Sequence, residues 1–186
     1  IHDTALEGWN NKKIINPEKK IISIGQSDAE IKKVINDFSP DIVAISVLFS
    51  NLLESANNIA NLVKQVNKNT IVILGGNHIS GSLTDYKFSM ADKNSNLPNY
   101  ITELENENID LAMTGEGEYS MLELVNTLSN KGDIGKVPGV VKKIGEKKYL
   151  INPPKRIHDL NILPRPARYM TNMEGYFDTI HRLNIK

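Results

Sequence analysis

A run of four apolar residues followed by two glycines constrains the fold of this chain more than any other feature. Residues 71–74 read Ile-Val-Ile-Leu, and Gly75 and Gly76 follow directly. A continuous, mostly β-branched run of this length is typical of a strand buried on both faces of a parallel sheet. Glycines at the end of such a strand let the backbone turn sharply and let a ligand approach closely. Because ligands bind at the carboxyl ends of strands in open parallel sheets, we expect the function of the chain near Gly75 and Gly76.

Strands and helices alternate over the first 134 residues. Apolar runs predict further strands, and apolar positions at helical spacing predict the helices between them. The strands are expected at residues 1–3, 21–24, 41–48 and 109–114, and the helices at residues 27–38, 52–66 and 119–129. This alternation indicates βαβ units with right-handed crossovers, and therefore a doubly wound α/β fold with a parallel, flavodoxin-like sheet.

Less regular segments complete this part of the chain. Residues 4–20 read as a loop, and residues 79–107 read as a long polar connection with a short helix near residues 100–106. Ser27 and Glu30 have the spacing of a capping box, which places the start of the first helix.

The pattern changes after residue 134. Two apolar runs, residues 137–144 and 148–151, flank a turn that contains Gly145 and predict a β-hairpin. Four prolines beyond the hairpin predict an extended tail. We therefore predict an α/β domain over residues 1–134, and a hairpin with a linker over residues 135–186.

Composition argues against several classes of function. The chain has 22 Lys and Arg residues and 22 Asp and Glu residues, so no basic excess favours nucleic acid or an anionic membrane surface as a partner. No apolar run approaches the roughly 20 residues needed to span a bilayer. The chain has no cysteine, which excludes disulfides, thiolate zinc sites and cysteine-held iron–sulfur clusters within it. A cytoplasmic location is the expectation.

The candidate binding residues lie in the turns that follow the predicted strands. Gly75, Gly76, Asn77 and His78 predict a ligand-facing turn, and a tight turn without a ligand is the alternative. Ser46 ends the neighbouring strand, where its hydroxyl would either bind a ligand or cap its own turn.

Two further turns are candidates. Gly115, Glu116 and Gly117 open a helix, where free N–H groups favour anions, although glutamate at a helix start is also ordinary dipole complementation. Asp3 ends the first predicted strand, and a solvated carboxylate is the alternative there. No nucleophile, base and acid can be assembled from motif spacing. We therefore expect no catalytic residue and no metal ligand in this chain.

Taken together, these motifs resemble one protein family. They are similar to the cobalamin-binding domain that precedes the catalytic barrel in class B radical S-adenosylmethionine proteins, and the closest pattern is the anaerobic magnesium-protoporphyrin IX monomethyl ester oxidative cyclase type. The segments that carry the resemblance are Asp-Thr-Ala-Leu-Glu-Gly at residues 3–8, Pro-Asp-Ile-Val-Ala-Ile-Ser-Val-Leu-Phe-Ser at 40–50, Ile-Leu-Gly-Gly-Asn-His at 73–78, Gly-Glu-Gly-Glu at 115–118, and the tail at 157–168. The resemblance covers most of the chain.

The resemblance implies a Rossmann-like domain with a cobalamin lying across the carboxyl edge of its sheet. The turns at Ser46, Leu48, Gly75 and Gly76 would contact the lower face and nucleotide tail of the cofactor, and the same motifs add Asp3, Phe49, Asn77, His78, Gly115, Glu116 and Gly117 as cofactor-binding residues. The family signature has a histidine two residues after the aspartate, and Ala5 stands at that position here. The resemblance therefore implies His-off cobalamin, with no imidazole ligand from this motif.

The same resemblance implies a role within a larger enzyme. The chain resembles the cofactor-positioning domain of a radical S-adenosylmethionine enzyme, of the oxidative cyclase or methyltransferase type. Such a domain supplies no chemistry alone. Its partner would be the radical S-adenosylmethionine barrel of the same polypeptide, which would hold the iron–sulfur cluster and the S-adenosylmethionine. The first strand and helix of the family are expected to precede residue 1.

Two alternatives stay open. A cofactor-free interaction or lid domain of the same kind of enzyme would keep this fold, and Ala5 allows that role. A nucleotide-binding α/β domain is the second alternative, although the three-glycine fingerprint of dinucleotide sites is absent. A tightly bound, coloured cofactor would argue against the first alternative. The sequence carries no expectation about the oligomeric state.

Overall fold

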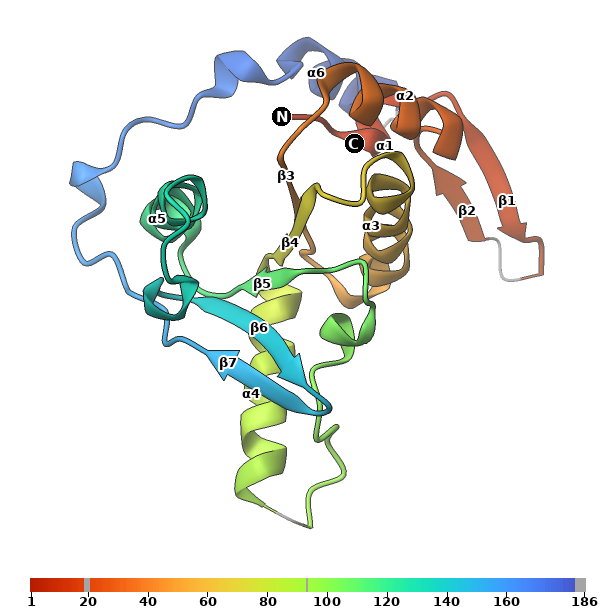
Figure 1. Ribbon diagram of the computed structural model, residues 1–186. Coiled ribbons are helices and arrows are strands. Elements are labelled where there is room, and N and C mark those ends of the chain that lie inside the picture. Colours follow the sequence, from red (N-terminus) through yellow and green to blue (C-terminus); the bar gives the residue numbers. More distant parts are fainter. Residues whose placement is uncertain (19–20, 93, 183–186) are drawn as a thin grey trace. The chain divides into compact units, whose positions relative to one another are not determined.

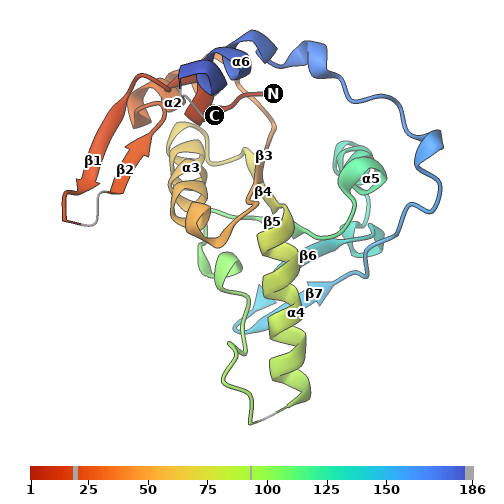
Figure 2. The same ribbon diagram turned by 180° about the vertical axis from the view of Figure 1, so that it is seen from behind.

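A computed structural model describes residues 1–18, 21–92 and 94–182 of the 186-residue chain. The chain divides into two compact units, which are described separately here. One unit comprises Ile1–Phe38 together with Leu163–Lys186, and the other comprises Ser39–Ile162. Figures 1 and 2 show the elements of both units from opposite sides. Within the described ranges, no helix combines the length and the apolar character that crossing a membrane requires.

The larger unit is built on a five-stranded sheet with the order β3-β4-β5-β6-β7. Its strands are β3 (Ile42–Ser46), β4 (Ile71–Gly75), β5 (Leu111–Met113), β6 (Val140–Gly145) and β7 (Lys148–Ile151). The first three strands are parallel neighbours, as the βαβ pattern predicted, and β6 and β7 add to the same sheet in antiparallel pairing. The hairpin prediction is confirmed, and the sheet is mixed because the hairpin joins it. The domain division at residue 134 stays a prediction.

Helices cover both faces of the parallel strands. Helix α3 (Leu53–Val66) follows β3, and helix α5 (Gly117–Ser129) follows β5. Figures 1 and 2 show α3 and α5 on opposite sides of β4. This arrangement confirms the α/β fold class.

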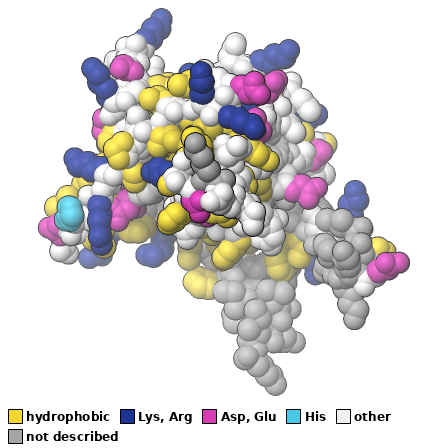
Figure 3. All heavy atoms as spheres, turned by 90° about the horizontal axis from the view of Figure 1, so that it is seen from below, with side chains coloured by type: hydrophobic (Ala, Val, Ile, Leu, Met, Phe, Trp, Pro, Cys, Tyr) yellow, Lys and Arg dark blue, Asp and Glu magenta, His cyan; other side chains and the backbone are white. Residues whose placement is uncertain are grey.

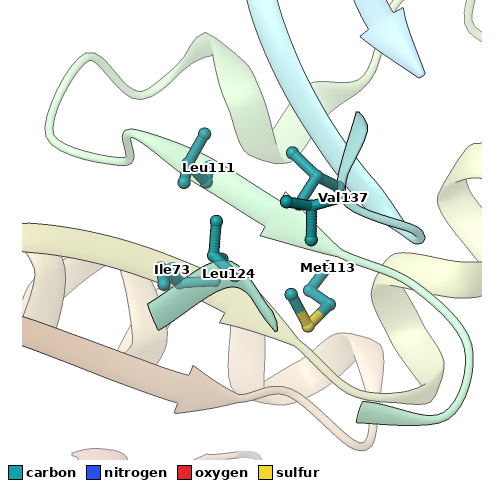
Figure 4. Packing of buried hydrophobic residues seen from close by; sticks show 6 residues of the cluster. Ile73, Leu111, Met113, Leu124 and Val137 are labelled. Carbon is teal, nitrogen blue, oxygen red and sulfur yellow. The ribbon is translucent and has the colours of Figure 1, made fainter. Parts of the chain in front are cut away.

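One part of the core of the larger unit lies between α5 and the sheet. Leu124 of α5 packs against residues of β4, β5 and β6 and is fully buried, as Figure 4 shows. The other members of this cluster are Ile73, Leu111, Met113, Val137 and Val140. Burying an aliphatic side chain of this size stabilises the fold by about 2 kcal/mol. The cluster therefore fixes α5 on the sheet and with it the turn that precedes α5.

Two sequence-based predictions in the larger unit are wrong. The connection at residues 79–107 begins with a 15-residue helix, α4 (Asn77–Ala91), and only a short 3-10 helix, Thr102–Glu105, lies near the expected second helix. Only Ile79 and Leu83 of α4 are buried, so the sequence has no apolar stripe that would have indicated this helix.

The other wrong prediction concerns the burial of β3. The apolar run at residues 41–48 indicates a buried strand, but Ala44 and Ser46 are exposed. The reason is that β3 is an edge strand, which pairs only with β4 among the described residues.

The smaller unit contains α1 (Thr4–Glu7), β1 (Lys12–Asn16), β2 (Ile21–Ile24), α2 (Asp28–Phe38) and α6 (Met173–Arg182). The strand expected at residues 1–3 and the loop expected at residues 4–20 are both wrong, because Asp3 caps α1 and β1 pairs antiparallel with β2. The capping box is confirmed, since the backbone N–H and the hydroxyl of Ser27 both lie 2.7 Å from the Glu30 carboxylate.

A buried lysine ties together the amino ends of the parallel strands. Lys64 at the end of α3 donates to the carbonyl oxygen of Thr70 and to the Asp110 carboxylate, each at 2.7 Å. The same Asp110 oxygen accepts the backbone N–H of Val72 in β4 at 2.7 Å. The Lys64 side chain is only 14% exposed, so its charge depends on these partners.

We predict that Lys64→Met lowers the free energy of unfolding by about 1–3 kcal/mol, because the Asp110 carboxylate loses its cationic partner and the Thr70 carbonyl loses the donor from Lys64. Chemical denaturation followed by circular dichroism measures this change. Lys68→Met is the matched control, since Lys68 lies one turn further along and is exposed. Equal effects of the two substitutions would show that the Lys64 contacts do not stabilise the sheet.

Candidate functional site

The glycine turn after β4 is held against the end of β3 by backbone hydrogen bonds. The N–H of Val47 donates to the Gly75 carbonyl at 2.7 Å, and the N–H of His78 donates to the Val47 carbonyl at 3.1 Å. Gly76 lies between these bonds with φ of +101°, and a Cβ there would lie 2.5 Å from the Val47 carbonyl oxygen. The fold itself therefore requires glycine at position 76.

Gly75 differs from Gly76 because nothing in the described structure requires it to be glycine. Its φ lies outside the left-handed region, and the nearest atom to an added Cβ would be the Met113 carbonyl oxygen at 3.7 Å, an ordinary contact. An alanine would fit there. The small residue leaves open space at the carboxyl edge of β4, which is where a parallel sheet binds its ligands.

An apolar rim lies beside this space. Val47 is fully buried and anchors the segment, whereas Leu48 is 52% exposed and Phe49 is 67% exposed. Ser46 at the end of β3 is exposed as well. Large apolar side chains that are left exposed next to an open strand edge are suited to the face of a broad, flat ligand. We refer to Leu48 and Phe49 as the rim.

His78 lies at the centre of a polar cluster that begins two residues after Gly76. Its Nδ1 atom lies 3.0 Å from the Ser50 hydroxyl, and its Nε2 atom lies 2.7 Å from a carboxylate oxygen of Glu103. The second oxygen of Glu103 accepts a hydrogen bond from the Ser82 hydroxyl at 2.7 Å. The Nε2 atom and the Glu103 oxygen are close, but their geometry is not that of an aligned hydrogen bond. The imidazole is thus engaged on both sides by the protein.

This polar cluster forms one wall of a cavity of about 450 Å³. The cavity lies between the rim, the first turns of α4 and the segment that leads to the 3-10 helix. Its lining includes the aromatic side chains Phe49, Tyr86 and Tyr100, and also Asn77 and Asp85. The mixture of aromatic walls and a few polar groups is typical of small-molecule sites. On the face shown in Figure 3, acidic and basic side chains are interspersed.

The turn after β5 is occupied by the chain's own tail. Gly115 has φ of +79°, and an added Cβ would lie 2.4 Å from the Pro154 side chain. The Glu116 carboxylate accepts the backbone N–H of Ile157. An added Cβ at Gly117 would meet nothing within 4 Å. The structure therefore gives Gly115 and Glu116 a role in holding the tail, and their contact with a ligand stays a prediction.

Asp3 belongs to the smaller unit, and its carboxylate is already engaged there. One oxygen accepts the backbone N–H groups of Ala5 and Leu6 at 3.0 Å, and the other accepts the Tyr176 hydroxyl. Partial burial alone would raise the pKa of Asp3, but the hydrogen bonds from Tyr176, Leu6 and Ala5 outweigh it and lower the pKa below its usual value. Asp3 therefore serves as an ionised helix cap.

A tyrosine from the hairpin supports the far wall of the cavity. The Tyr149 hydroxyl accepts the backbone N–H of Ile101 at 3.0 Å and donates to Glu105 at 2.8 Å. Its ring meets Tyr86 edge to face, with the ring centres 5.3 Å apart. Partial burial, reinforced by the Glu105 carboxylate, raises the pKa of Tyr149 to about 12. The hairpin thus fixes the segment that carries Glu103.

Sequence reasoning missed Glu103, Ser82 and Tyr149. Ser82 and Glu103 lie within residues 79–107, and Tyr149 contacts that segment through Ile101 and Tyr86. The segment was predicted to be a polar connection, in which a glutamate usually lies at the surface. Glu103 is instead 2% exposed. The only signal in the sequence was His78 itself, whose place after a glycine turn indicated a site but not a partner.

Comparison with known protein families gives a match across the centre of this site. The B12 binding domain family matches residues 9–92, a range that contains β3, the rim, the glycine turn and His78. The matched residues make up slightly less than half of the chain. Asp3, Gly115, Glu116 and Gly117 lie outside the matched range. The match supports the resemblance to a cobalamin-binding domain, and cofactor contacts of the individual β3 and β4 residues stay predictions.

Curated relatives of the B12-binding domain are named as methyltransferases. The chain is 25% identical over 199 residues to cytidylyl-2-hydroxyethylphosphonate methyltransferase of Streptomyces wedmorensis, covering 96% of this chain and 34% of that protein. It is 28% identical over 148 residues to an uncharacterized methyltransferase of Pyrococcus horikoshii, covering 80% of this chain and 28% of that protein. The chain therefore spans about a third of the length of these relatives.

A solved structure shares the fold of the B12-binding domain. The cobalamin-dependent S-adenosylmethionine radical enzyme OxsB, solved with aqua-cobalamin and S-adenosylmethionine bound, has a TM-score of 0.51 and 20% identity. The similarity covers 72% of this chain and 16% of OxsB. At this level of identity the likeness concerns the fold alone, and it confirms the Rossmann-like architecture.

We predict that the protein loses stability between about pH 10 and 12 because of Tyr149. In the unfolded chain a tyrosine ionises near pH 10, whereas Tyr149 ionises near pH 12 in the folded chain, so the folded state binds the proton more tightly. The contribution is complete below pH 10 and is lost as the pH rises through 12.

Denaturation midpoints measured from pH 8 to 12 test this, with Tyr149→Phe and the control Tyr119→Phe, since Tyr119 is 42% exposed. At neutral pH, Tyr149→Phe should cost about 1 kcal/mol or more, because the buried N–H of Ile101 loses its acceptor. In Tyr149→Phe the denaturation midpoint should also fall less between about pH 10 and 12 than in the unmodified chain, whereas in Tyr119→Phe it should fall as much. An unchanged decline in Tyr149→Phe would contradict the prediction.

Proposed function

We propose that the carboxyl edge formed by β3 and β4 binds cobalamin, and that the chain positions this cofactor for a larger enzyme. The observation that carries the proposal is the open space at Gly75, where the structure itself imposes no glycine. The space lies within the B12-binding range and next to the exposed rim of Leu48 and Phe49. A ligand approach at Gly75 gives the residue a reason to be glycine.

The residues at this edge fit a cobalamin in size and chemistry. A corrin is a broad plate with apolar faces and polar side chains at its border. We propose that Leu48 and Phe49 cover part of its face and exclude water, while Ser46 and Asn77 offer hydrogen bonds at its border. Gly75 would let the ligand approach the backbone, next to the turn that Gly76 fixes. Gly115, Glu116 and Gly117 are further proposed contacts at the turn after β5. His78 would shape the site without touching the cofactor, and a cofactor contact of Asp3 stays a separate proposal for the smaller unit.

We propose that the bound cobalamin is His-off. Ala5 stands where the family signature has its histidine. His78 is nearest to the glycine turn, but Ser50 engages its Nδ1 atom and Glu103 faces its Nε2 atom, so neither nitrogen points freely to a metal. When bound, cobalamin would carry a methyl group or take part in electron transfer. The residues of this chain would bind and orient it without donating or accepting protons.

We propose that the longer protein is a radical S-adenosylmethionine methyltransferase. The named methyltransferase relatives support this reaction over an oxidative cyclisation, which is the second reading. This chain contains no cysteine, so an iron–sulfur cluster and its S-adenosylmethionine would lie on a barrel elsewhere in the same polypeptide. Residues 135–186 would lead toward that barrel, and the enzyme would be cytoplasmic.

Calorimetric titration with hydroxocobalamin tests the proposed site. We predict saturable binding by the unmodified chain, and a loss of about tenfold or more in affinity for Gly75→Ala, because the added methyl group occupies space meant for the ligand. The free energy of unfolding should change by less than about 1 kcal/mol, since a Cβ at this position fits the protein.

Gly145→Ala is the matched control for Gly75→Ala. An added Cβ at Gly145 would also have its nearest neighbour at 3.7 Å. Gly145 ends β6, which runs antiparallel to β5, so it lies at the end of the sheet away from Gly75. Its cobalamin affinity should equal that of the unmodified chain. Absence of binding by the unmodified chain would contradict the proposal and favour the cofactor-free lid domain. Equal cobalamin affinity of the unmodified chain, Gly75→Ala and Gly145→Ala would show that the cofactor does not bind at Gly75.

A further inference from the structure

Glu103 is a carboxylate in a position where a carboxylate is costly. It is 2% exposed and lies in the 3-10 helix before β5. An unpaired buried charge would destabilise the fold strongly. Its two oxygens are compensated by Ser82 and by His78, both from α4, at 2.7 Å each. Glu103 can therefore be buried because His78 and Ser82 each face one of its oxygens.

His78 also reaches the segment that follows β3, and it does so twice. Its backbone N–H donates to the Val47 carbonyl at 3.1 Å, and its Nδ1 atom lies 3.0 Å from the Ser50 hydroxyl. Val47 and Ser50 are the two residues that flank Leu48 and Phe49. The side chains of the rim are 52% and 67% exposed, so packing alone does not fix their position. His78 thus holds the rim from both ends.

We propose that His78 and Glu103 are positioning residues, which hold the rim through Ser50 in the arrangement that receives cobalamin. Glu103 fixes the imidazole from the side of the 3-10 helix, and the imidazole fixes Ser50. Neither residue contacts the cofactor in this proposal, since both ring nitrogens face the protein. The inference rests on the proposed cobalamin site at the β3 and β4 edge, and it adds the residues that shape that site.

Two substitutions of His78 separate its two contacts. In His78→Asn the amide takes the place of Nδ1, so the link to Ser50 is kept and the contact with Glu103 is lost. In His78→Gln the amide reaches the place of Nε2, so the contact with Glu103 is kept and the link to Ser50 is lost. If His78 acts on the rim through Ser50, the affinity for hydroxocobalamin should fall about tenfold in His78→Gln and should be largely retained in His78→Asn.

Ser50→Ala and its combination with His78→Gln complete a double-mutant cycle on cobalamin affinity. Each single substitution removes the same link, so we expect the double variant to lose no more affinity than either single variant. Thr84→Ala is the control for a deleted hydroxyl. Its hydroxyl donates to the Ser80 carbonyl on the exposed side of α4, and its affinity should be unchanged. Thermal unfolding of every variant shows that titrations are made on folded protein.

The outcomes distinguish the inference from the function on which it rests. If the unmodified chain does not bind hydroxocobalamin, the proposed function fails and the inference falls with it. If the unmodified chain binds and His78→Gln and Ser50→Ala bind equally well, the site stands and the positioning role is overturned. Additive losses of cobalamin affinity in the double variant also overturn it. So do affinity losses in both His78 variants that are proportional to their losses of thermal stability. Retained affinity in His78→Asn beside a loss in His78→Gln supports it.

Discussion

The backbone junction between Val47 and the glycine turn is the constraint on which the carboxyl edge depends. The Val47 amide donates to Gly75 and its carbonyl accepts from His78, with the Gly76 Cα held close against that carbonyl. This close approach requires glycine at position 76. It also fixes where α4 begins, where the segment after β3 leaves the sheet, and therefore where the rim and His78 stand.

Polar contacts extend this junction to the segment before β5, in which Ile101, Leu104 and Ile109 are also buried. The segment before β5 is tied to α3 by asparagine pairs, in which Asn106 donates to Asn57 at 3.0 Å and Asn108 donates to Asn61 at 2.9 Å. Tyr149 holds it from the hairpin, and Glu103 holds it to α4. Hydrogen bonds together with buried apolar side chains thus position the cavity wall, and the apolar cluster under α5 supports the sheet.

The sequence was sufficient for elements whose apolar pattern is strong and local. The strand at residues 71–74, helices α3 and α5 and the β-hairpin were predicted correctly. That the glycine turn is the centre of the site stays a prediction. Helix α4 was missed because its burial rests on Ile79 and Leu83, which is too little for a period to be visible. The N-terminal strand was wrong because a capped turn and a pairing with β2 took its place.

The site could be predicted only as far as single turns. Gly75 and Gly76 look alike in the sequence, and only the structure shows that Gly76 serves the fold while Gly75 leaves room. Glu116 looked like a ligand-facing residue, but its carboxylate accepts an N–H of the tail, which lies 41 residues away in the sequence. Contacts over such distances follow from topology and packing, and no local pattern encodes them.

Hydrogen–deuterium exchange with and without hydroxocobalamin tests the central claim most directly, because it reports where the cofactor covers the chain. The account places the cofactor on the β3 and β4 edge. Exchange should therefore slow in peptides covering residues 44–50 and 73–80, and should stay unchanged in peptides of the β6–β7 hairpin. Protection confined to other segments, or no protection at saturating cobalamin, would contradict the account.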